Sequence, residues 1–408
     1  MASPNRTTAN GPLDGIRVLD CTQMMAGPFC TMLLADMGAD VVKIEKPDGD
    51  DIRRFGPPFV NGESAAFLGI NRNKRSIVID LKQGAGADLL RRMAGQADVF
   101  VQNLRPGALD RLGLGYDDLR EVNGSLIYCS ISGFGMTGPY RDRPGFDLIA
   151  QGMSGLMSLT GHPDSPPAKV GVPITDLNAG ASGAFGIVCA LVSRQKTGKG
   201  QHVDTSLLEA GIAYTIWESA MFFASGVAPK RLGSAHQLGA PYQAFSTSDG
   251  HITLGAPNQA NWERLCKAIG RTDLIQDPRF GSNADRMKNV KELTRILEET
   301  FKTNTMERWL DLLRDSGLPC GPISDMKEVY ADPHIQAREM VVELEHPIAG
   351  PVRNIGVPTK LSETPATVRL PAPTLGQHTD KVLDSFGCST QEIERLSEAG
   401  VIRQGPGL

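Results

Sequence analysis

An aspartate in a stretch of small side chains is the residue of this sequence best suited to covalent chemistry. Asp176 lies in the segment GVPITDLNAGASGAFG, where a short apolar segment, expected to be a strand, gives way to alanines and glycines. The small residues Ala179, Gly180 and Gly183 would leave room for a bulky ligand against the carboxylate. A carboxylate held beside an acyl group can act as a nucleophile. The alternative is that Asp176 caps the helix that begins here, and this segment alone leaves both interpretations open.

Histidine offers a second chemistry, the acid–base catalysis of a racemase or a hydrolase. The sequence has seven histidines, and none lies in a G-x-S-x-G or H-E-x-x-H motif. A surface or structural role is therefore the general expectation for them. His236, in the glycine-flanked segment LGSAHQLGAP, is kept as a candidate.

Nucleotide binding is a third chemistry to consider, because an acidic residue, Glu45, ends the second expected strand. The turn after the first strand reads CTQMMAGPF and has one glycine where the dinucleotide fingerprint needs three. The segment TGKGQ has Gly200 where a P-loop needs Ser or Thr to meet magnesium. These departures argue against NAD binding and against ATP-driven ligation. We expect TGKGQ to be a turn that ends a helix.

The candidate residues have to be positioned by an alternation of strands and helices. GIRVLD (15–20) and DVVKIE (40–45) are expected strands, separated by a helix in AGPFCTMLLADMGA that ends at Gly38. Spacing this short indicates a parallel strand–helix–strand unit. RSIVIDL, ADVFVQN and SLIYCSIS continue the pattern. The sequence therefore predicts an α/β fold with a doubly wound parallel sheet.

Two domains are expected, because 408 residues are many for one hydrophobic core. Residues 1–225 are predicted to form a large, Rossmann-like domain. Residues 226–330 are predicted to form a smaller α+β domain, with a hairpin turn at Asp249–Gly250 and an amphipathic helix over 290–300. Residues 331–408 are predicted to return to the large domain.

Composition and charge exclude several other classes of protein. A net charge of −4 and a pI of about 6.0 provide no field that would gather nucleic acid or anionic membrane. No uninterrupted apolar run reaches the length of a membrane span. The seven cysteines include no C-x-x-C pair, which is typical of reduced cytosolic thiols and argues against a structural zinc site. The first residues, MASPNRTTANG, show no targeting signal, so a cytoplasmic protein is expected.

A series of ordered segments spans almost the whole chain: PLDGIRVLD, AGPFCTMLLADMGADVVKIEKP, NRNKRSIVIDLK, DVFVQNLRPGALDRLGLGYDDL, IYCSISGFGMTGP, PGFDLIAQGMSGLMSLTG, TDLNAG, KTGKGQHVD, PYQAFSTSDGHI, GLPCGPI and PTLGQHTD. Together they resemble the class III CoA-transferase (CaiB/BaiF) family. TDLNAG is similar to the nucleophile segment of that family, which favours the catalytic interpretation of Asp176. GDDIRRFGPPFV, LGLGYDDL, SLIYCSISGFG and RLGSAHQLGAPYQAF resemble the succinate–hydroxymethylglutarate CoA-transferase branch.

The resemblance implies an enzyme that moves CoA from an acyl-CoA donor, succinyl-CoA in this branch, to a short dicarboxylate through an aspartyl-CoA thioester at Asp176. It implies no tightly bound cofactor, since the CoA thioester is a substrate. Two positions depart from other branches. The racemases have GHD where this chain has GFD, with Phe146, and formyl-CoA transferase has Gln where this chain has Met25. A formyl-CoA-type transferase using another acid, an α-methylacyl-CoA racemase and an inactive CoA-binding paralogue are the alternatives.

The resemblance also implies which residues hold the substrates, and that the chain forms an interlocked homodimer. A loop from Gly233 to Gly239, which includes His236, is expected to close over the site. A basic cluster is a candidate to bind phosphates or the distal carboxylate of a dicarboxylate: Arg53, Arg54, Arg72, Lys74 and Arg75. The CoA contacts implied by the family pattern are Met25, Ala26, Lys46, Leu81, Lys82, Asn103, Leu104, Arg105 and Arg111, with Phe146 and Asp147 near the pantetheine end.

Overall fold

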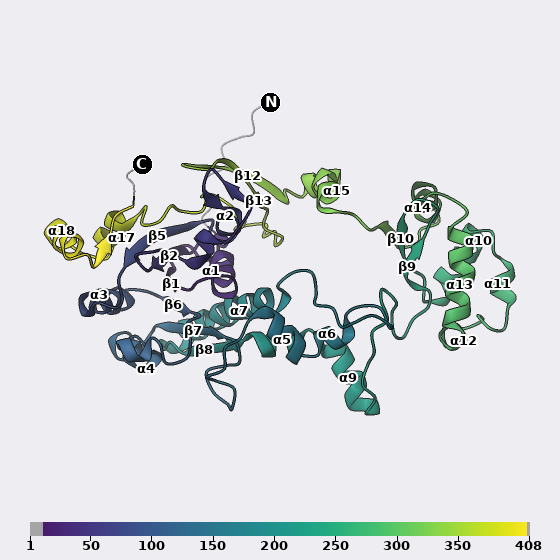
Figure 1. Ribbon diagram of the computed structural model, residues 1–408, viewed down its shortest axis with the longest axis horizontal. Coiled ribbons are helices and arrows are strands. Elements are labelled where there is room, and N and C mark those ends of the chain that lie inside the picture. Colours follow the sequence, from purple (N-terminus) through teal and green to yellow (C-terminus); the bar gives the residue numbers. More distant parts are fainter. Residues whose placement is uncertain (1–10, 406–408) are drawn as a thin grey trace. The chain divides into compact units, whose positions relative to one another are not determined.

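The structure, a computed structural model, describes residues 11–405 of the chain (Figure 1). Its contacts divide this part of the chain into two compact units. The first unit comprises residues 11–156, 169–225 and 333–405, and the second comprises 157–168 and 226–332. The second unit therefore includes residues 157–168, which the sequence analysis placed within 1–225.

The first unit is built on a seven-stranded sheet of order β14-β5-β2-β1-β6-β7-β8. Only β14 is antiparallel to its neighbour. Counted along the chain, the six parallel strands have the doubly wound order 3-2-1-4-5-6. The predicted α/β fold with a mainly parallel sheet is confirmed. The strands are β1 (Arg17–Cys21), β2 (Asp40–Glu45), β5 (Lys74–Ile79), β6 (Val99–Gln102), β7 (Ile127–Ser132), β8 (His202–Ser206) and β14 (Ile402–Arg403).

Helices cover both faces of this sheet, because successive strand residues point to opposite sides. The strand residues on one face of the sheet, such as Val18, pack against α1 (Ala26–Asp36) and α7 (Ile174–Thr197). The strand residues on the opposite face, such as Leu19, pack against α3 (Gly84–Ala94), α4 (Tyr116–Val122), α17 (Thr379–Ser385) and α18 (Thr390–Glu398). The other elements of this unit are η1 (Asp51–Arg54), β3 (Phe59–Val60), β4 (Glu63–Ser64), α2 (Ala65–Ile70), η2 (Asp110–Leu112), α5 (Asp147–Met153), α8 (Leu207–Ala213), α9 (Ile216–Ser225), α16 (Pro333–Ala337), β12 (Val341–His346) and β13 (Gly350–Ile355). The short α6 (Leu156–Leu159) spans the boundary between the two units.

Helix α7 carries Asp176 and differs from the expectation at its start. The predicted short strand before Asp176 is wrong, because the helix already begins at Ile174. Its end is as predicted: Gly198, with φ +69°, takes the left-handed conformation that terminates a helix after Thr197. The length and apolar composition of α7 alone would allow it to cross a membrane. This is weak evidence, since α7 packs on the sheet as a core helix.

The second unit has an antiparallel sheet of order β11-β10-β9. Thr247 N donates to Gly250 O at 2.9 Å, which confirms the predicted hairpin turn. The core of this unit includes Phe245, Trp262 and Phe301. Its elements are β9 (Tyr242–Ser246), β10 (His251–Gly255), α10 (Gln259–Ala268), α11 (Asp273–Gln276), α12 (Asn283–Lys288), α13 (Val290–Phe301), α14 (Met306–Asp315), β11 (Cys320–Pro322) and α15 (Met326–Ala331).

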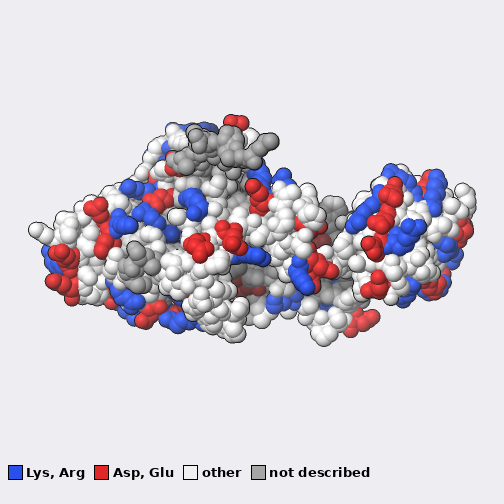
Figure 2. All heavy atoms as spheres, turned by 90° about the horizontal axis from the view of Figure 1, so that it is seen from above, with Lys and Arg blue, Asp and Glu red and all other residues white. Residues whose placement is uncertain are grey.

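Charged side chains of both signs are interspersed on the face of the molecule shown in Figure 2. This distribution agrees with the small net charge of −4. A polyanionic ligand therefore has to be recognised by a local site rather than by a general field.

Candidate active site

A cavity of about 340 Å³ lies at the carboxyl ends of β1, β2, β5 and β6. Successive strands are added on one side of β1 as far as β5 and then on its other side from β6 onward, and doubly wound sheets bind ligands where the strand order reverses in this way. Four of the residues predicted to contact CoA line the cavity: Lys46, Leu81, Lys82 and Leu104. The cavity is therefore the candidate CoA site.

The other predicted CoA contacts lie around this edge of the sheet. Met25 is the N-cap of α1 and Ala26 is its first residue, directly after the turn that forms one cavity wall. Arg111 is exposed in η2. Arg105 lines a separate cavity of about 40 Å³, where Ser130 Oγ lies 2.8 Å from His202 Nε2. These positions remain predicted contacts.

The basic cluster predicted from the sequence is largely neutralised inside the protein. Arg53 pairs with Glu45, Arg72 with Asp36, Lys74 with Asp20 and Arg75 with Asp40, at 2.6–3.1 Å. The expectation that all five cations form a ligand-binding cluster is therefore wrong. Arg54 is the member with a well exposed guanidinium, and it lies 2.9 Å from Asp51.

Glu45, the acidic residue on which the dinucleotide-binding alternative was based, has both carboxylate oxygens occupied by hydrogen bonds within the protein. Its carboxylate accepts from Arg53 Nε at 2.7 Å, Arg53 Nη2 at 2.6 Å, Ser76 Oγ at 2.6 Å and Asp50 N at 3.0 Å. Burial alone would raise the pKa of Glu45, but these bonds hold it below its ordinary value. The carboxylate is not available to bind ribose hydroxyls, which agrees with the missing glycine fingerprint.

Asp176 lies in the first turn of α7 and does not cap it. The N-cap position is Pro173, and no side-chain capping bond is present at this end. Burial and the neighbouring charge of Asp147 raise the pKa of Asp176 to about 7. Within residues 11–405, no group donates a hydrogen bond to this carboxylate. Such a desolvated carboxylate is more reactive than one stabilised by hydrogen bonds.

Asp147 joins the start of α5 to the start of α7. Its Oδ1 accepts from Thr175 N at 3.0 Å and Thr175 Oγ1 at 2.8 Å, and its Oδ2 accepts from Gln151 Nε2 at 2.7 Å. These bonds hold a negative charge beside Asp176. The preceding residue, Phe146, has 73% of its surface exposed.

Glycines let α7 and α1 approach closely, with both helices running in the same direction. A Cβ atom at Gly180 would lie 2.5 Å from Ala26 O, and one at Gly183 would lie 3.3 Å from Cys30 Sγ. Residues four apart share a helix face, so Asp176 is one turn before Gly180 on this face. It therefore lies level with the turn that precedes α1.

The chain matches the model of CoA-transferase family III over residues 13–379, which is most of its length. It belongs to this family. The chain is 41% identical to human succinyl-CoA:glutarate CoA-transferase over 395 residues, covering 96% of this chain and 90% of that protein. It is also 41% identical to a succinate–glutarate CoA-transferase of Agrobacterium fabrum over 402 residues, covering 97% and 98%. A crystal structure of a CaiB/BaiF family protein from Brucella suis superposes with a TM-score of 0.84 at 39% identity, covering 92% and 100%.

The loop predicted to close over the site of this CoA-transferase belongs to the second unit. Gly233 has φ +64° and donates its N–H to Gly161 O at 3.0 Å. His236 Nδ1 accepts from Leu238 N at 3.1 Å, and its ring packs edge-on against Tyr242. A would-be Cβ atom at Gly239 would lie 2.9 Å from Pro257. Within this unit, His236 orders its own loop.

Sequence reasoning missed three buried ionic residues at the cavity of this CoA-transferase, of which Asp50 lines it. Asp20, Lys43 and Asp50 have at most 4% of their surface exposed. A signal for two of them was available, because Asp20 and Lys43 lie inside the apolar strand segments RVLD and DVVKIE. Charged residues at such positions need buried partners.

Proposed function

We propose that this CoA-transferase moves CoA from succinyl-CoA to a short dicarboxylate acceptor, and that Asp176 carries the CoA in between. The observation that supports Asp176 is its partly buried carboxylate, which has a raised pKa and lies level with the turn before α1. The names of relatives at 41% identity support succinyl-CoA as donor and glutarate as the first acceptor to test.

The reaction proceeds through alternating anhydrides and thioesters. The Asp176 carboxylate attacks the acyl carbonyl of succinyl-CoA, which forms a mixed anhydride and releases the CoA thiolate. The thiolate attacks the Asp176 carbonyl carbon, which forms an aspartyl-CoA thioester and releases succinate. The acceptor carboxylate attacks this thioester and releases the thiolate, which then attacks the acceptor acyl group of the new anhydride. Acceptor-CoA leaves, and the Asp176 carboxylate is regenerated.

This sequence needs no ATP, because one thioester replaces another of similar energy. Bound orientation of carboxylate and thioester supplies roughly 7–11 kcal/mol of the barrier reduction. The anhydrides are sensitive to water, so the site has to exclude it while they exist. Lys46, Leu81, Lys82 and Leu104 are proposed to hold CoA in the cavity.

The rate of the first step should depend on pH through Asp176. Only the carboxylate is nucleophilic, and its pKa is about 7, so kcat/KM for succinyl-CoA should rise about ten-fold per pH unit below 7 and level off above it. An Asp147→Asn substitution removes a negative charge that raises this pKa, so the midpoint should move to lower pH. Initial rates measured from pH 5 to 9 test this. A profile with the same midpoint in both proteins would contradict the assignment.

Acceptor specificity is tested by incubating the protein with succinyl-CoA and C4–C6 dicarboxylates, with butyrate as the monocarboxylate control. We expect glutaryl-CoA from glutarate, detected by mass spectrometry, and much less butyryl-CoA. If none of the dicarboxylates accepted CoA, the proposed acceptor class would be wrong. Exchange of the α-proton in deuterium oxide without transfer would instead indicate the racemase alternative.

We further propose that the chain acts as a homodimer in the cytoplasm. Exposed apolar side chains on α7 and α9 support a second copy as the occupant of this surface: Phe185 is 73% exposed, Trp217 56% and Phe223 80%. The family resemblance implies the same state. Light scattering after gel filtration should give twice the chain mass of 43.8 kDa, and a monomer would contradict the homodimer. Fractionation of the source cells would test the location.

A further inference from the structure

The turn between β1 and α1, residues Thr22–Met24, lies between the two parts of the candidate site, the cavity proposed to bind CoA and the nucleophile Asp176. Thr22 and Gln23 line the cavity proposed to bind CoA. The turn ends at the start of α1, level with Asp176 on α7. A displacement of this turn would therefore affect both the bound CoA and its distance from the nucleophile.

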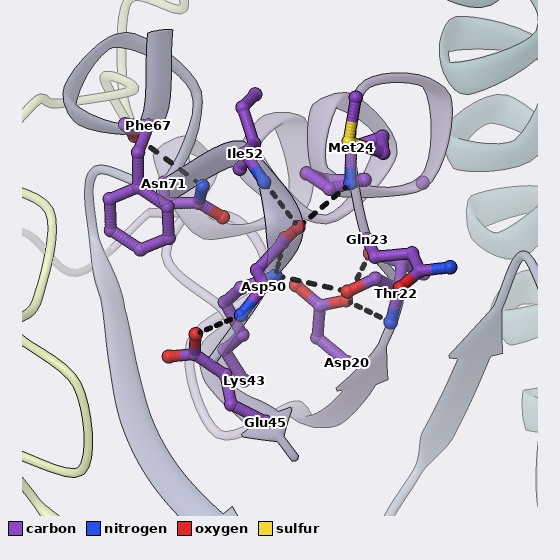
Figure 3. A network of polar contacts seen from close by, with 12 residues as sticks. Asp20, Thr22, Gln23, Met24, Lys43, Glu45, Asp50, Ile52, Phe67 and Asn71 are labelled. Carbon is purple, nitrogen blue, oxygen red and sulfur yellow. Dashed lines mark hydrogen bonds and ion pairs between the residues drawn. The ribbon is translucent and has the colours of Figure 1, made fainter. Parts of the chain in front are cut away.

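Side chains from other elements hold the backbone at both ends of this turn (Figure 3). Thr22 N donates to Asp20 Oδ1 at 3.0 Å, and Thr22 O accepts from Lys43 Nζ at 3.0 Å. Met24 N donates to Asp50 Oδ1 at 3.1 Å. Met24 has φ +65°, a left-handed conformation that is uncommon for a residue with a side chain. The external bonds fix a turn shape that glycines usually permit.

The central residue of the turn, Gln23, is held by a single amide. Gln23 N donates to Asn103 Oδ1 at 2.9 Å, and Gln23 O accepts from Asn103 Nδ2 at 2.8 Å. The Asn103 amide therefore bonds the N–H and C=O of Gln23 as the backbone of a neighbouring strand would. Asn103 follows β6, the strand that pairs with β1 where the strand order of the sheet reverses.

We propose that Asn103 is a positioning residue for CoA: its amide holds the backbone of Gln23, and thereby the cavity wall, rather than acting as a ligand contact itself. Oδ1 and one N–H of Nδ2 are both engaged by this backbone. The proposal rests on the proposed function only in taking CoA as the ligand of this cavity. It assigns to Asn103 an effect that is present before any ligand binds.

The test compares Asn103→Ala with Asn123→Ala. Asn123 is a matched control, because its amide also holds backbone, donating to Ala97 O at 2.9 Å and accepting from Ser125 N at 3.1 Å. It lies before β7, at the opposite end of the strands from the cavity. The readouts are the Kd of free CoA by calorimetry, kcat and KM with succinyl-CoA, and hydrogen exchange of a peptide covering residues 22–25 in the ligand-free protein.

For Asn103→Ala we expect faster exchange in this peptide without ligand, and a Kd and KM for the CoA compounds about ten-fold higher. We expect kcat to change less, and Asn123→Ala to leave the exchange of the turn and the Kd unchanged. Weaker CoA binding with unchanged exchange would overturn the proposal in favour of a direct contact. Faster exchange with unchanged binding would also overturn it. If the unaltered protein bound no CoA, the proposed function itself would fail.

Discussion

Replacing Asp176 by Ala or by Asn is expected to abolish CoA transfer, with a loss of at least about 10³-fold in kcat. Neither side chain offers an anionic oxygen that can attack a thioester and later leave. The measurement is intact-protein mass spectrometry after mixing with succinyl-CoA and trapping with hydroxylamine or borohydride. The unaltered protein should carry an adduct on the peptide that contains Asp176. An adduct or continued transfer in Asp176→Ala would exclude this residue as the nucleophile.

The stability of the Asp176→Asn variant should show that the loss of activity is not a loss of folding. The unfolded aspartate ionises near pH 3.8, whereas the folded one keeps its proton up to about pH 7. The folded state therefore binds more protons in between, and this residue lowers the stability of the protein as pH rises through that window. Asp176→Asn should be more stable than the unaltered protein at pH 8, and this advantage should vanish at pH 4. Urea unfolding at the two pH values measures the difference.

Removing the buried cation Lys43 is expected to destabilise the protein by about 3–5 kcal/mol. Lys43 Nζ lies 2.8 Å from Asp50 Oδ2, and both side chains are at most 2% exposed. Burial alone would lower the pKa of Lys43, but Asp50, Asp20 and Glu45 raise it, so the group stays charged. A Lys43→Met substitution would leave the Asp50 carboxylate buried without its counter-ion. The free energy of unfolding in urea at pH 7 measures the cost.

A matched control for this substitution lies three residues further along the chain. Lys46 Nζ also pairs with a carboxylate, Asp51 Oδ1, at 2.7 Å, but its side chain is 48% exposed. Lys46→Met should therefore change the unfolding free energy by about 1 kcal/mol or less. Because Lys46 is a proposed CoA contact, the substitution should instead raise the KM for succinyl-CoA. Equal stability of the Lys43→Met and unaltered proteins would show that the buried pair contributes little.

The parallel sheet and the glycine-terminated ends of its helices were predictable from the sequence because their signals are local. A strand such as Asp40–Glu45 is an apolar run bounded by turns, and Gly198 ends α7 because glycine tolerates a left-handed backbone. In a doubly wound parallel sheet, ligand binding is expected at the carboxyl ends of the strands. Lys46, Leu81 and Leu104 were placed at this edge by the family pattern, and they line the cavity.

What each charged or polar side chain does there was decided only by the tertiary structure, because its partner can lie anywhere in the chain. Arg72 looked available for a ligand until Asp36, on another element, proved to neutralise it. Asn103 is a predicted CoA contact from the family pattern, and only the fold shows that its amide also holds the backbone of Gln23, 80 residues away in the chain. The raised pKa of Asp176 likewise depends on burial and on Asp147. Sequence patterns determine which residues form the strands and helices, whereas burial and electrostatic pairing depend on distances that exist only after the chain has folded.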